Sequence, residues 1–374
     1  MIEIKELTSP KELKRFVKYP FELYKNEPNW VPPLISDELE SMDPAKNPVF
    51  KNATARYFMA FKQEKPVGRI CAITNNIEIE EQGKRKMRFG WFDAIDDIEV
   101  TKALLDKVAE IGKKKNLEWM EGPVGFSNME KAGMLIEGFE YLNTMITWYN
   151  YPYYKDHFEQ LGFEKAAEWV EFKIKIQPAE KQNPKVAKFS NIISERYKLK
   201  PLDFKTTAEI KPYVDEMFGL LNKTYNTLST FVPIKQYQID HYKDKFIKYI
   251  NPDYIKCIQD QEGRLVAFAI VMPSFNKALK KANGRLFPTG FFHLLKARKK
   301  NDTAAFYLIG IEPEYQGKGV TAVIFQKMQE LFNKEGITDV ETNPELEENK
   351  AIQQLWKGYE HELHKRRRTY RKNL

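Results

Sequence analysis

The feature of the chain that most constrains its fold is an internal repeat, with an offset of roughly 200 residues between its copies. Residues 65–73 and 264–272 are both strand-like and follow a polar turn. Residues 104–123 and 324–344 both contain an amphipathic helix, a polar turn, a short strand and a proline. We interpret this order as a tandem duplication, which divides the 374 residues into two similar domains.

Each half is expected to be an α/β (α+β) domain with the same order of elements. Helices come first, then a hairpin, a long strand, a helix, a strand, a helix and a final strand. This order predicts a mixed, largely antiparallel central sheet flanked by helices. We place the domains at residues 1–178 and 189–374, because the stretch between them is polar and contains proline.

Composition limits the class of protein. Hydrophobic residues make up 42% and charged residues 30%, so each half can build a core. Cys71 and Cys257 stand far apart and the five histidines do not cluster, so we expect no disulfide framework and no metal site. The first residues lack the apolar stretch of a signal peptide, and the longest apolar run, 266–272, is shorter than a membrane span. A cytoplasmic, soluble protein is expected.

The positive charge is local. The chain has a net charge of +8, yet residues 277–300 hold eight basic side chains and no acidic one. The tail, 361–374, holds six basic side chains against one glutamate. These two segments together exceed the net charge of the whole chain, so the remainder is acidic.

The basic segment forms an insert, 274–300, in which leucines and phenylalanines lie between the lysines and arginines. Such a segment suits peripheral contact with an anionic membrane at the inner face, and the tail could add to that contact. Alternatively, its aromatic side chains pack against the core and its lysines form a solvated rim. Nucleic acid is not an expected partner, because no helix-turn-helix, RNP or zinc-finger pattern accompanies the charge.

A glycine-rich turn joins a strand to a helix in the second half. The apolar strand ends at Ile311, Pro313 stops it, and a helix is predicted to open near Val320. Gly317 and Gly319 allow backbone N–H groups to approach a ligand closely, and the helix N-terminus favours an anion. The turn is therefore predicted to bind a pyrophosphate, although a lone glycine pair is usually a simple turn.

The series of strand, turn, helix and second strand, followed by Asn349 and residues 350–359, resembles the GNAT acyltransferase superfamily. That resemblance implies acetyl-CoA or a longer acyl-CoA as a substrate. Six residues would hold the CoA pyrophosphate or open the helix beside it: Gln316, Gly317, Lys318, Gly319, Val320 and Thr321. The pantetheine arm would pair with Leu308, Ile309, Gly310 and Ile311, and Asn349 would face it.

Two residues depart from the pattern of the superfamily. Thr321 stands where glycine or alanine is usual. Trp356 occupies the position at which many members have a tyrosine that protonates the leaving thiolate, and indole cannot act as that acid. Tyr359 is a substitute candidate for the acid, or else a packing residue.

The corresponding turn of the first half has no glycine cradle. Its helix is predicted to open on Asp96, Asp97 and Glu99, which suit an N-terminal cap but would repel a pyrophosphate. We therefore expect a degenerate first domain that supplies an acceptor site, a wall of the cleft or structural support.

Longer strings narrow the resemblance to the bacterial ceramide synthase-like family of tandem GNAT proteins, over nearly the whole chain. The strings are residues 26–34, 89–93, 122–128, 149–154, 284–288, 343–349 and 364–368. The resemblance implies acyl transfer from a CoA thioester to an amine, with a sphingoid base or another lipid amine as the expected acceptor. The alternatives are an N-acetyltransferase acting on a soluble amine or peptide, and a non-catalytic CoA-binding or scaffold protein.

Two carboxylates are candidates for the general base of such a transfer. Glu341 lies on the strand expected beside the cofactor strand, and Glu312 follows the cofactor strand directly. Glu345, Glu347 and Glu348 are expected to cap the next helix. The tyrosines at 149–154 either line an apolar acceptor groove or form an ordinary packing patch.

Overall fold

The computed structural model describes residues 1–127, 129–182, 184–246 and 250–374. The chain divides into two compact units, each built from segments that are not contiguous in sequence. Unit 1 contains Met1–Val170, Phe275–Leu295 and His364–Leu374, and unit 2 contains Glu171–Ser274 and Lys296–Leu363. Each unit is described by itself below.

Unit 1 is a sheet with helices on both faces. Its strand order is β1-β2-β3-β4-β5-β14, in which only β4 and β5 run parallel. The elements are β1 (Ile2–Leu7), α1 (Pro10–Leu23), α2 (Ile35–Ser41), β2 (Ala53–Lys62), β3 (Lys65–Asn75), β4 (Lys86–Ala94), α3 (Ile98–Lys114), β5 (Trp119–Gly122), β6 (Met134–Glu137), α4 (Tyr153–Gln160), the start of β7 (Glu164–Lys175), α9 (Asn276–Ala282), the start of α10 (Gly290–Lys299) and the end of β14 (His361–Asn373).

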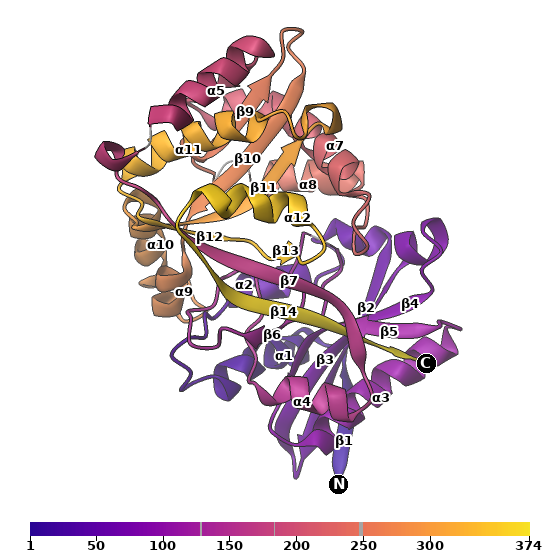
Figure 1. Ribbon diagram of the computed structural model, residues 1–374. Helices are drawn as coiled ribbons and strands as arrows, with labels where there is room; N and C mark the ends of the chain where they lie inside the picture. The colour runs from indigo at the N-terminus through magenta and orange to yellow at the C-terminus, as the bar shows by residue number, and fades with distance from the viewer. Residues whose placement is uncertain (128, 183, 247–249) are drawn as a thin grey trace. The chain divides into compact units, whose positions relative to one another are not determined.

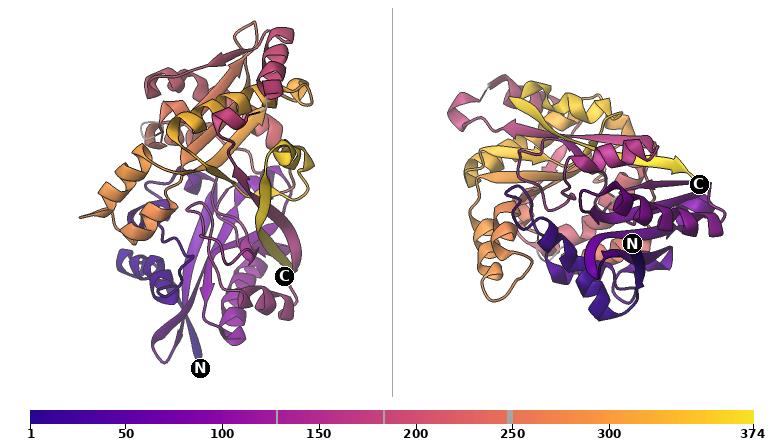
Figure 2. Two further views of the ribbon diagram at one scale, coloured as in Figure 1. Left: turned by 60° about the vertical axis from the view of Figure 1, so that its left-hand side comes forward. Right: turned by 90° about the horizontal axis from the view of Figure 1, so that it is seen from below.

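Alternation along β2 separates the two faces. Phe58 and Ala60 pack in an apolar cluster with residues of α3 such as Leu104, whereas Tyr57 and Met59 pack in a second cluster with residues of α1 such as Phe16. Side chains of a strand alternate between faces, so one strand supplies both clusters. Figure 2 shows the helices on either side of these strands.

Local signals fix where the helices of unit 1 begin. Ser9 and Glu12 form a capping box at the start of α1, and Pro10 occupies the first helical position. Asp97 caps α3 by accepting a hydrogen bond from the N–H of Glu99 at 3.0 Å. The prediction that this helix opens on acidic caps is confirmed.

Unit 2 has the strand order β7-β12-β11-β10-β9-β8, in which only β11 and β12 run parallel. In Figure 1, α5 and α11 lie on one side of β9, β10 and β11, and α7 and α8 lie on the other. The elements are the end of β7, α5 (Pro184–Arg196), β8 (Lys200–Leu202), α6 (Thr207–Ile210), α7 (Val214–Tyr225), α8 (Gln236–Phe246), β9 (Ile255–Gln259), β10 (Leu265–Pro273), the end of α10, β11 (Thr303–Ile311), α11 (Val320–Glu335), β12 (Asp339–Thr342), β13 (Glu345–Leu346), α12 (Lys350–Gln353), the short 3₁₀ helix η8 (Gln354–Gly358) and the start of β14.

The predicted mixed sheets, largely antiparallel and flanked by helices, are therefore confirmed. The repeated order is present as well: β2 to β5 correspond to β9 to β12, with α3 in the place of α11. The apolar run 266–272 is β10, and its nearly continuous burial agrees with helices on both of its faces.

Two long strands pass from one unit into the other. Strand β7 begins in unit 1, and from Glu171 onward it belongs to unit 2, where Lys175 pairs with Asp339. Strand β14 begins in unit 2, and from His364 onward it belongs to unit 1, where Tyr370 pairs with Gly122. The expected division at residues 178 and 189 remains a prediction about the duplicated halves, because the compact units do not follow it.

The insert also differs from its expected place in the second domain. Residues Phe275–Leu295 belong to unit 1. The carbonyl of Gly284 accepts a hydrogen bond from the N–H of Ile35 at 3.0 Å, and the side chain of Asn276 accepts one from the N–H of Met145 at 3.1 Å. These bonds attach α9 to the α1–α2 region and to the loop that precedes α4.

The expected membrane contact through the tail is wrong for Lys365 and Arg367. Lys365 and Arg367 are fully buried in β14. Arg366 and Arg368 both form ion pairs with Glu168, at 3.0 and 2.8 Å. Lys365 and Arg367 are therefore not available to a membrane surface, whereas Arg366 and Arg368 are partly exposed and paired with Glu168.

We predict that Arg367→Met destabilises the protein while Arg371→Met does not. Arg367 donates hydrogen bonds to the carbonyl of Trp148 and to Oδ1 of Asn143, whereas the Arg371 side chain is exposed on the same strand. Loss of buried hydrogen bonds should lower the free energy of unfolding by about 2–4 kcal/mol, against a change of about 0.5 kcal/mol or less for the exposed site. Urea denaturation measures both; equal midpoints would contradict the buried role.

Candidate active site

The pairing of β11 with β12 stops before β11 ends. Their parallel ladder runs from Thr303 opposite Asp339 to Phe306 opposite Thr342, and β11 then continues to Ile311. The register of β11 with β10 shifts at the same place, so that Tyr307 has no opposite residue in that ladder. This bulge bends the strand where the two strands separate.

Two side chains reach the separated part of β11. Asn343 donates from Nδ2 to the carbonyl of Tyr307 at 2.8 Å, and the hydroxyl of Tyr225 on α7 donates to the carbonyl of Ile309 at 3.0 Å. A carbonyl oxygen has two lone pairs, so both carbonyls keep the capacity to accept a second hydrogen bond. Beyond Phe306, β11 has no described ladder with β12, and the pairing of this part with an extended ligand arm remains a prediction.

The glycine-rich turn has the predicted geometry. Strand β11 ends at Ile311 and α11 begins at Val320. Gly317 and Gly319 have φ angles of +72° and +81°, in the left-handed region that favours glycine. Gly319 is the N-cap of α11 and has no side chain to cap it, so the first N–H groups of the helix remain donors for an anion.

Side chains support and border this turn. Gln316 donates from Nε2 to the carbonyl of Ile311 at 3.1 Å, which ties the turn back to the strand. The ammonium of Lys318 lies 5.5 Å from the ring centre of Tyr197 and 5.4 Å from that of Tyr315, as cation–π contacts. A Cβ on Gly319 would lie 3.1 Å from the side chain of Ile193 on α5. Val320 is buried, whereas Thr321 is half-buried.

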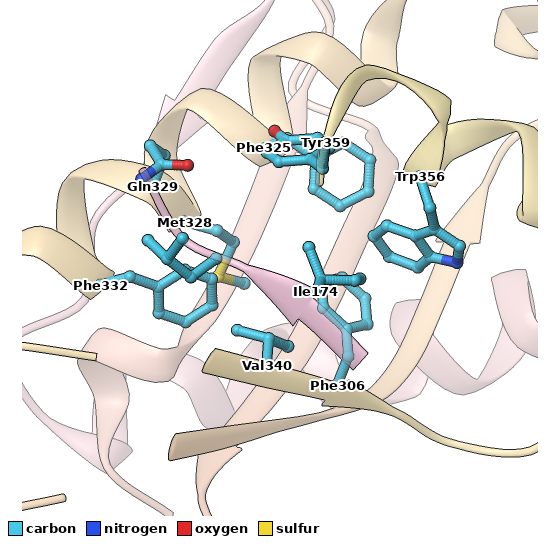
Figure 3. Close-up of a pocket in the computed structure, with 10 residues that line it drawn as sticks. Ile174, Phe306, Phe325, Met328, Gln329, Phe332, Val340, Trp356 and Tyr359 are labelled. Atoms are coloured by element: carbon cyan, nitrogen blue, oxygen red, sulfur yellow. The ribbon is translucent and has the colours of Figure 1, made fainter. Parts of the chain in front are cut away.

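A small apolar pocket of about 20 Å³ lies between α11, η8 and the strands of unit 2. Figure 3 shows Tyr359, Phe325 and Trp356 along one side and Phe306, Val340 and Ile174 along another. Burial raises the pKa of Tyr359. Its ring lies 6.1 Å from that of Phe325, so it is both a packing residue and a lining residue.

Trp356 joins this pocket to a buried carboxyl group. Its ring lines the pocket, and its indole nitrogen points away from the other lining residues (Figure 3). That nitrogen donates a hydrogen bond to Oε1 of Glu345 at 2.8 Å. Glu345 is 7% exposed, and its Oε2 has no hydrogen-bond partner among the described residues.

The surroundings of Glu345 favour its neutral form. Burial raises the pKa of this carboxyl to about 8, although hydrogen bonds with Trp356 and Thr342 lower it in part. The expectation that Glu345 caps the next helix is wrong, because it lies in β13 and α12 begins only at Lys350. The available signal in the sequence was the tryptophan, since a buried indole N–H usually requires an acceptor.

The two carboxylates proposed from sequence lie elsewhere. Glu312 is buried and its Oε2 accepts a hydrogen bond from Lys223 at 2.6 Å, in an ion pair. Glu341 alternates with Val340, which lines the pocket, so its side chain points to the opposite face of the sheet. Asn349 is half-buried after β13, where its N–H bonds to the carbonyl of Leu346 at 2.9 Å. Neither Glu312 nor Glu341 lines the pocket beside Trp356 and Tyr359.

In unit 1, the chain itself fills the equivalent opening. The parallel pairing of β4 and β5 ends at Arg88 opposite Glu121. The carbonyl of Phe89 then accepts a hydrogen bond from the N–H of Val124 at 2.8 Å, and a Cβ on Gly90 would lie 2.4 Å from the carbonyl oxygen of Val124. The tyrosines at 149–154 form a packing patch, in which the rings of Tyr149 and Tyr151 both lie against Tyr24.

This fold, with two sheets of matching order, is a tandem GNAT fold. A tandem GNAT protein from the clavulanic acid biosynthesis pathway superposes with a TM-score of 0.57 at 11% identity, covering 100% of this chain and 98% of that one. A GCN5-related N-acetyltransferase from Sphaerobacter thermophilus superposes with a TM-score of 0.52 at 9% identity, covering 100% and 95%. No family model matches the chain.

Two proteins are similar in sequence over nearly the full length. Protein YghO of Escherichia coli K12 is 28% identical over 377 aligned positions, which cover 99% of this chain and 95% of that protein. The bacterial ceramide synthase of Caulobacter vibrioides is 23% identical, covering 98% and 96%. These matches confirm the resemblance to the bacterial ceramide synthase-like tandem GNAT proteins.

Two further findings concern the described part of the chain only. No group of three or more His, Cys, Asp or Glu side chains there is placed to hold a metal ion. None of the helices in the same ranges has both the length and the apolar character required to cross a bilayer.

We predict that Glu345→Gln makes the protein more stable at pH 8 but not at pH 4.5. Because the pKa of Glu345 is raised from 4.5 to about 8 on folding, the folded state holds the proton more tightly. Its contribution to stability is present below pH 4.5 and is lost as the pH rises through the folded value. An amide cannot ionise, so the gain at pH 8 should be about 4 kcal/mol, from about 1.4 kcal/mol for each pH unit between the unfolded and folded pKa values.

Urea denaturation at the two pH values measures this difference. Glu330→Gln is the matched control, because Glu330 is an exposed residue of α11. A gain for Glu345→Gln that is equal at both pH values would contradict a buried group that titrates.

Proposed function

We propose that the protein is an acyl-CoA-dependent N-acyltransferase, whose unit 2 binds the CoA thioester and transfers its acyl group to an amine. The observation that carries the proposal is the combination of an open cofactor strand and an uncapped, glycine-flanked helix N-terminus within one unit. The tandem GNAT fold supports it, as does the full-length similarity to a protein named bacterial ceramide synthase.

In this proposal the turn and the first helical residues hold the pyrophosphate through backbone N–H groups. These residues are Gln316, Gly317, Lys318, Gly319, Val320 and Thr321. Residues 308–311 of β11 pair with the pantetheine arm, and Asn349 faces it. Tyr359 lines the pocket beside the thioester, where its hydroxyl is a hydrogen-bond donor.

We further propose a lipid amine, such as a sphingoid base, as the acceptor, taken up at an anionic membrane surface. The insert presents an exposed aromatic surface, made of Phe287, Phe291, Phe292 and Leu295, which are 77%, 44%, 68% and 37% exposed. All eight basic side chains of the insert are exposed as well. Aromatic side chains that enter the acyl boundary beside lysines that meet anionic headgroups provide both contributions to interfacial binding.

A soluble amine or peptide is the alternative acceptor, and a CoA-binding protein without catalysis is the alternative function. Trp356 in the place of the tyrosine acid is the residue that favours the second of these. Turnover separates an enzyme from a protein that only binds CoA, and membrane binding separates a lipid acceptor from a soluble one.

We predict that the purified chain releases free thiol from acyl-CoA when an amine acceptor is added, and that Gly319→Val reduces this rate by about 100-fold or more. A valine at φ +81° is strained, and its side chain would approach Ile193 and occupy the proposed path of the phosphates. A thiol-trapping assay with acetyl-CoA and long-chain acyl-CoA, against a panel of sphingoid and soluble amines, measures the rate. Calorimetry with CoA measures affinity separately.

Gly336→Val is the matched control for this substitution. Gly336 also has a positive φ, +72°, but it ends α11 at the other terminus and has open space around it. It should carry the same backbone strain and leave CoA affinity unchanged. No thiol release with any acceptor would overturn the enzymatic proposal, and unchanged CoA affinity in Gly319→Val would overturn the cradle.

We predict that the protein floats with vesicles containing anionic lipid but not with neutral vesicles, and that Phe287→Ser with Phe292→Ser abolishes flotation. Loss of two exposed phenylalanines removes about 3–5 kcal/mol of apolar transfer energy. Ile192→Ser is the control, because Ile192 is 48% exposed on α5, outside the insert. A wild-type protein that remains at the bottom with every vesicle would favour the soluble acceptor.

A further inference from the structure

Glu345 is a buried carboxyl group of unit 2 that has no cationic partner among the described residues, unlike Glu312 and the half-buried Asp339. Glu312 is paired with Lys223 at 2.6 Å, and Asp339 is paired with Lys175 at 2.6 Å. No ion pair of Glu345 occurs within the ranges that the structure describes, and its Oε2 makes no hydrogen bond there. A buried carboxyl without a counter-charge is costly, so a structural role alone does not explain it.

The groups around Glu345 come from four elements. Trp356 of η8 donates to it at 2.8 Å, Thr342 of β12 stabilises its ionised form, and its charge helps to raise the pKa of Tyr225 on α7. Strand β7, the pairing partner of β13, carries Glu171, which is fully buried. Burial raises the pKa of Tyr225 to about 12, so this phenol is neutral when Glu345 ionises.

This group of side chains lies at the separation of β11 from β12. Thr342 is the last residue of the β12 ladder, and Tyr225 donates to the carbonyl of Ile309 on the open part of β11. Trp356 contacts Glu345 with its nitrogen and lines the apolar pocket with its ring. The carboxyl group is thus in contact with a residue that lines the pocket, and its charge acts on Tyr225, which is bonded to the open part of β11.

We propose that Glu345 is the proton-transfer residue of the acyl transfer and that Trp356 is the residue that positions it. This inference rests on the proposed N-acyltransferase function and assigns a role to a residue of the same site.

One carboxyl group is sufficient for the proton transfers of the reaction. The nitrogen lone pair of the neutral amine attacks the thioester carbon, so that a C–N bond forms and the carbonyl electrons move to oxygen. The Glu345 carboxylate accepts a proton from the nitrogen. As the carbonyl re-forms and the C–S bond breaks, the same proton passes from the carboxyl to the CoA thiolate. The products are an amide, free CoA thiol and the original carboxylate.

This scheme accounts for a tryptophan in the place of a tyrosine acid. Indole gives up no proton, but its N–H stabilises the carboxylate form of Glu345. A carboxyl group whose pKa is about 8 exchanges a proton near neutral pH in both directions, which is what a group acting first as base and then as acid requires.

The test compares Glu345→Gln and Trp356→Phe with the wild-type chain in thiol-release assays between pH 6 and 10. We expect the wild-type kcat to rise with an inflection near pH 8. Glu345→Gln should lower kcat by about 100-fold or more at every pH, with CoA affinity by calorimetry changed by less than about three-fold. Glu330→Gln on the exposed face of α11 is the matched control and should retain the wild-type kcat and profile.

The variant Trp356→Phe distinguishes a role of Trp356 in proton transfer from a role in packing alone. Without the indole donor the carboxylate form is less stable, so the inflection should move up by about one pH unit, and kcat should approach the wild-type value above it. A tryptophan that only filled space would change kcat equally at all pH values. An unshifted profile in this variant, or a Glu345→Gln kcat within about three-fold of wild type, would overturn the inference.

A readout without turnover distinguishes this inference from the function on which it rests. Intrinsic fluorescence of the wild type should change through a titration near pH 8, because Trp356 donates to the titrating group, and Glu345→Gln should lack that change. If the fluorescence titration is observed but Glu345→Gln leaves turnover unchanged, the inference is overturned and the acyltransferase function stands. No turnover by the wild type with any amine overturns both.

Discussion

The candidate site depends on one backbone event, the end of pairing between β11 and β12 after Phe306 and Thr342. Parallel strands that separate leave main-chain groups without a ladder partner, and such groups must be satisfied by side chains, water or a ligand. Here Asn343 and Tyr225 satisfy part of the strand, and α11 begins with uncapped N–H groups at the same end. Unit 1 has the same separation but closes it with its own chain at Val124. The two units thus differ in what satisfies the separated strands: the chain itself in unit 1, and side chains for part of β11 in unit 2.

Two buried acid groups, one in each unit, have opposite surroundings. In unit 1, Glu78 lies between Arg88 and Lys86, which hold its pKa at about 2, so it stays ionised and acts as a structural counter-charge. In unit 2, Glu345 has only the dipole of an indole N–H and the hydroxyl of Thr342. The first arrangement gives a fixed charge, whereas the second gives a group whose protonation can change under ordinary conditions. A buried carboxyl group without a counter-charge lowers the stability of the fold, and such destabilising groups are common in catalytic sites.

The sequence was sufficient for features that depend on local signals. The repeat predicted the mixed sheets, the glycine-rich turn predicted the end of β11 and the start of α11, and the acidic cap predicted the start of α3 at Asp97. Long-range packing was not predictable in this way. Arg367 is buried through hydrogen bonds to Trp148 and Asn143, which lie more than two hundred positions away. In the sequence alone, a run of cations is equally consistent with an exposed surface patch. Glu345 was missed although Trp356 lies only eleven positions away, because the sequence does not show that the glutamate is buried in β13 instead of capping the next helix. The pairing with pantetheine, the phosphate contacts and the role of Asn349 remain predictions.

The exchange of final strands has a consequence for how the two copies persist. In unit 2, the neighbour of β12 is the end of β7, which the first half encodes, and in unit 1, the neighbour of β5 is the end of β14, which the second half encodes. A gene fragment for either half would specify a sheet with an open edge together with a strand that has no sheet, a combination prone to mispairing. Neither half can be lost without removing a strand from the other. A first copy with a closed ligand opening is therefore retained as the source of a strand for the copy that keeps the opening.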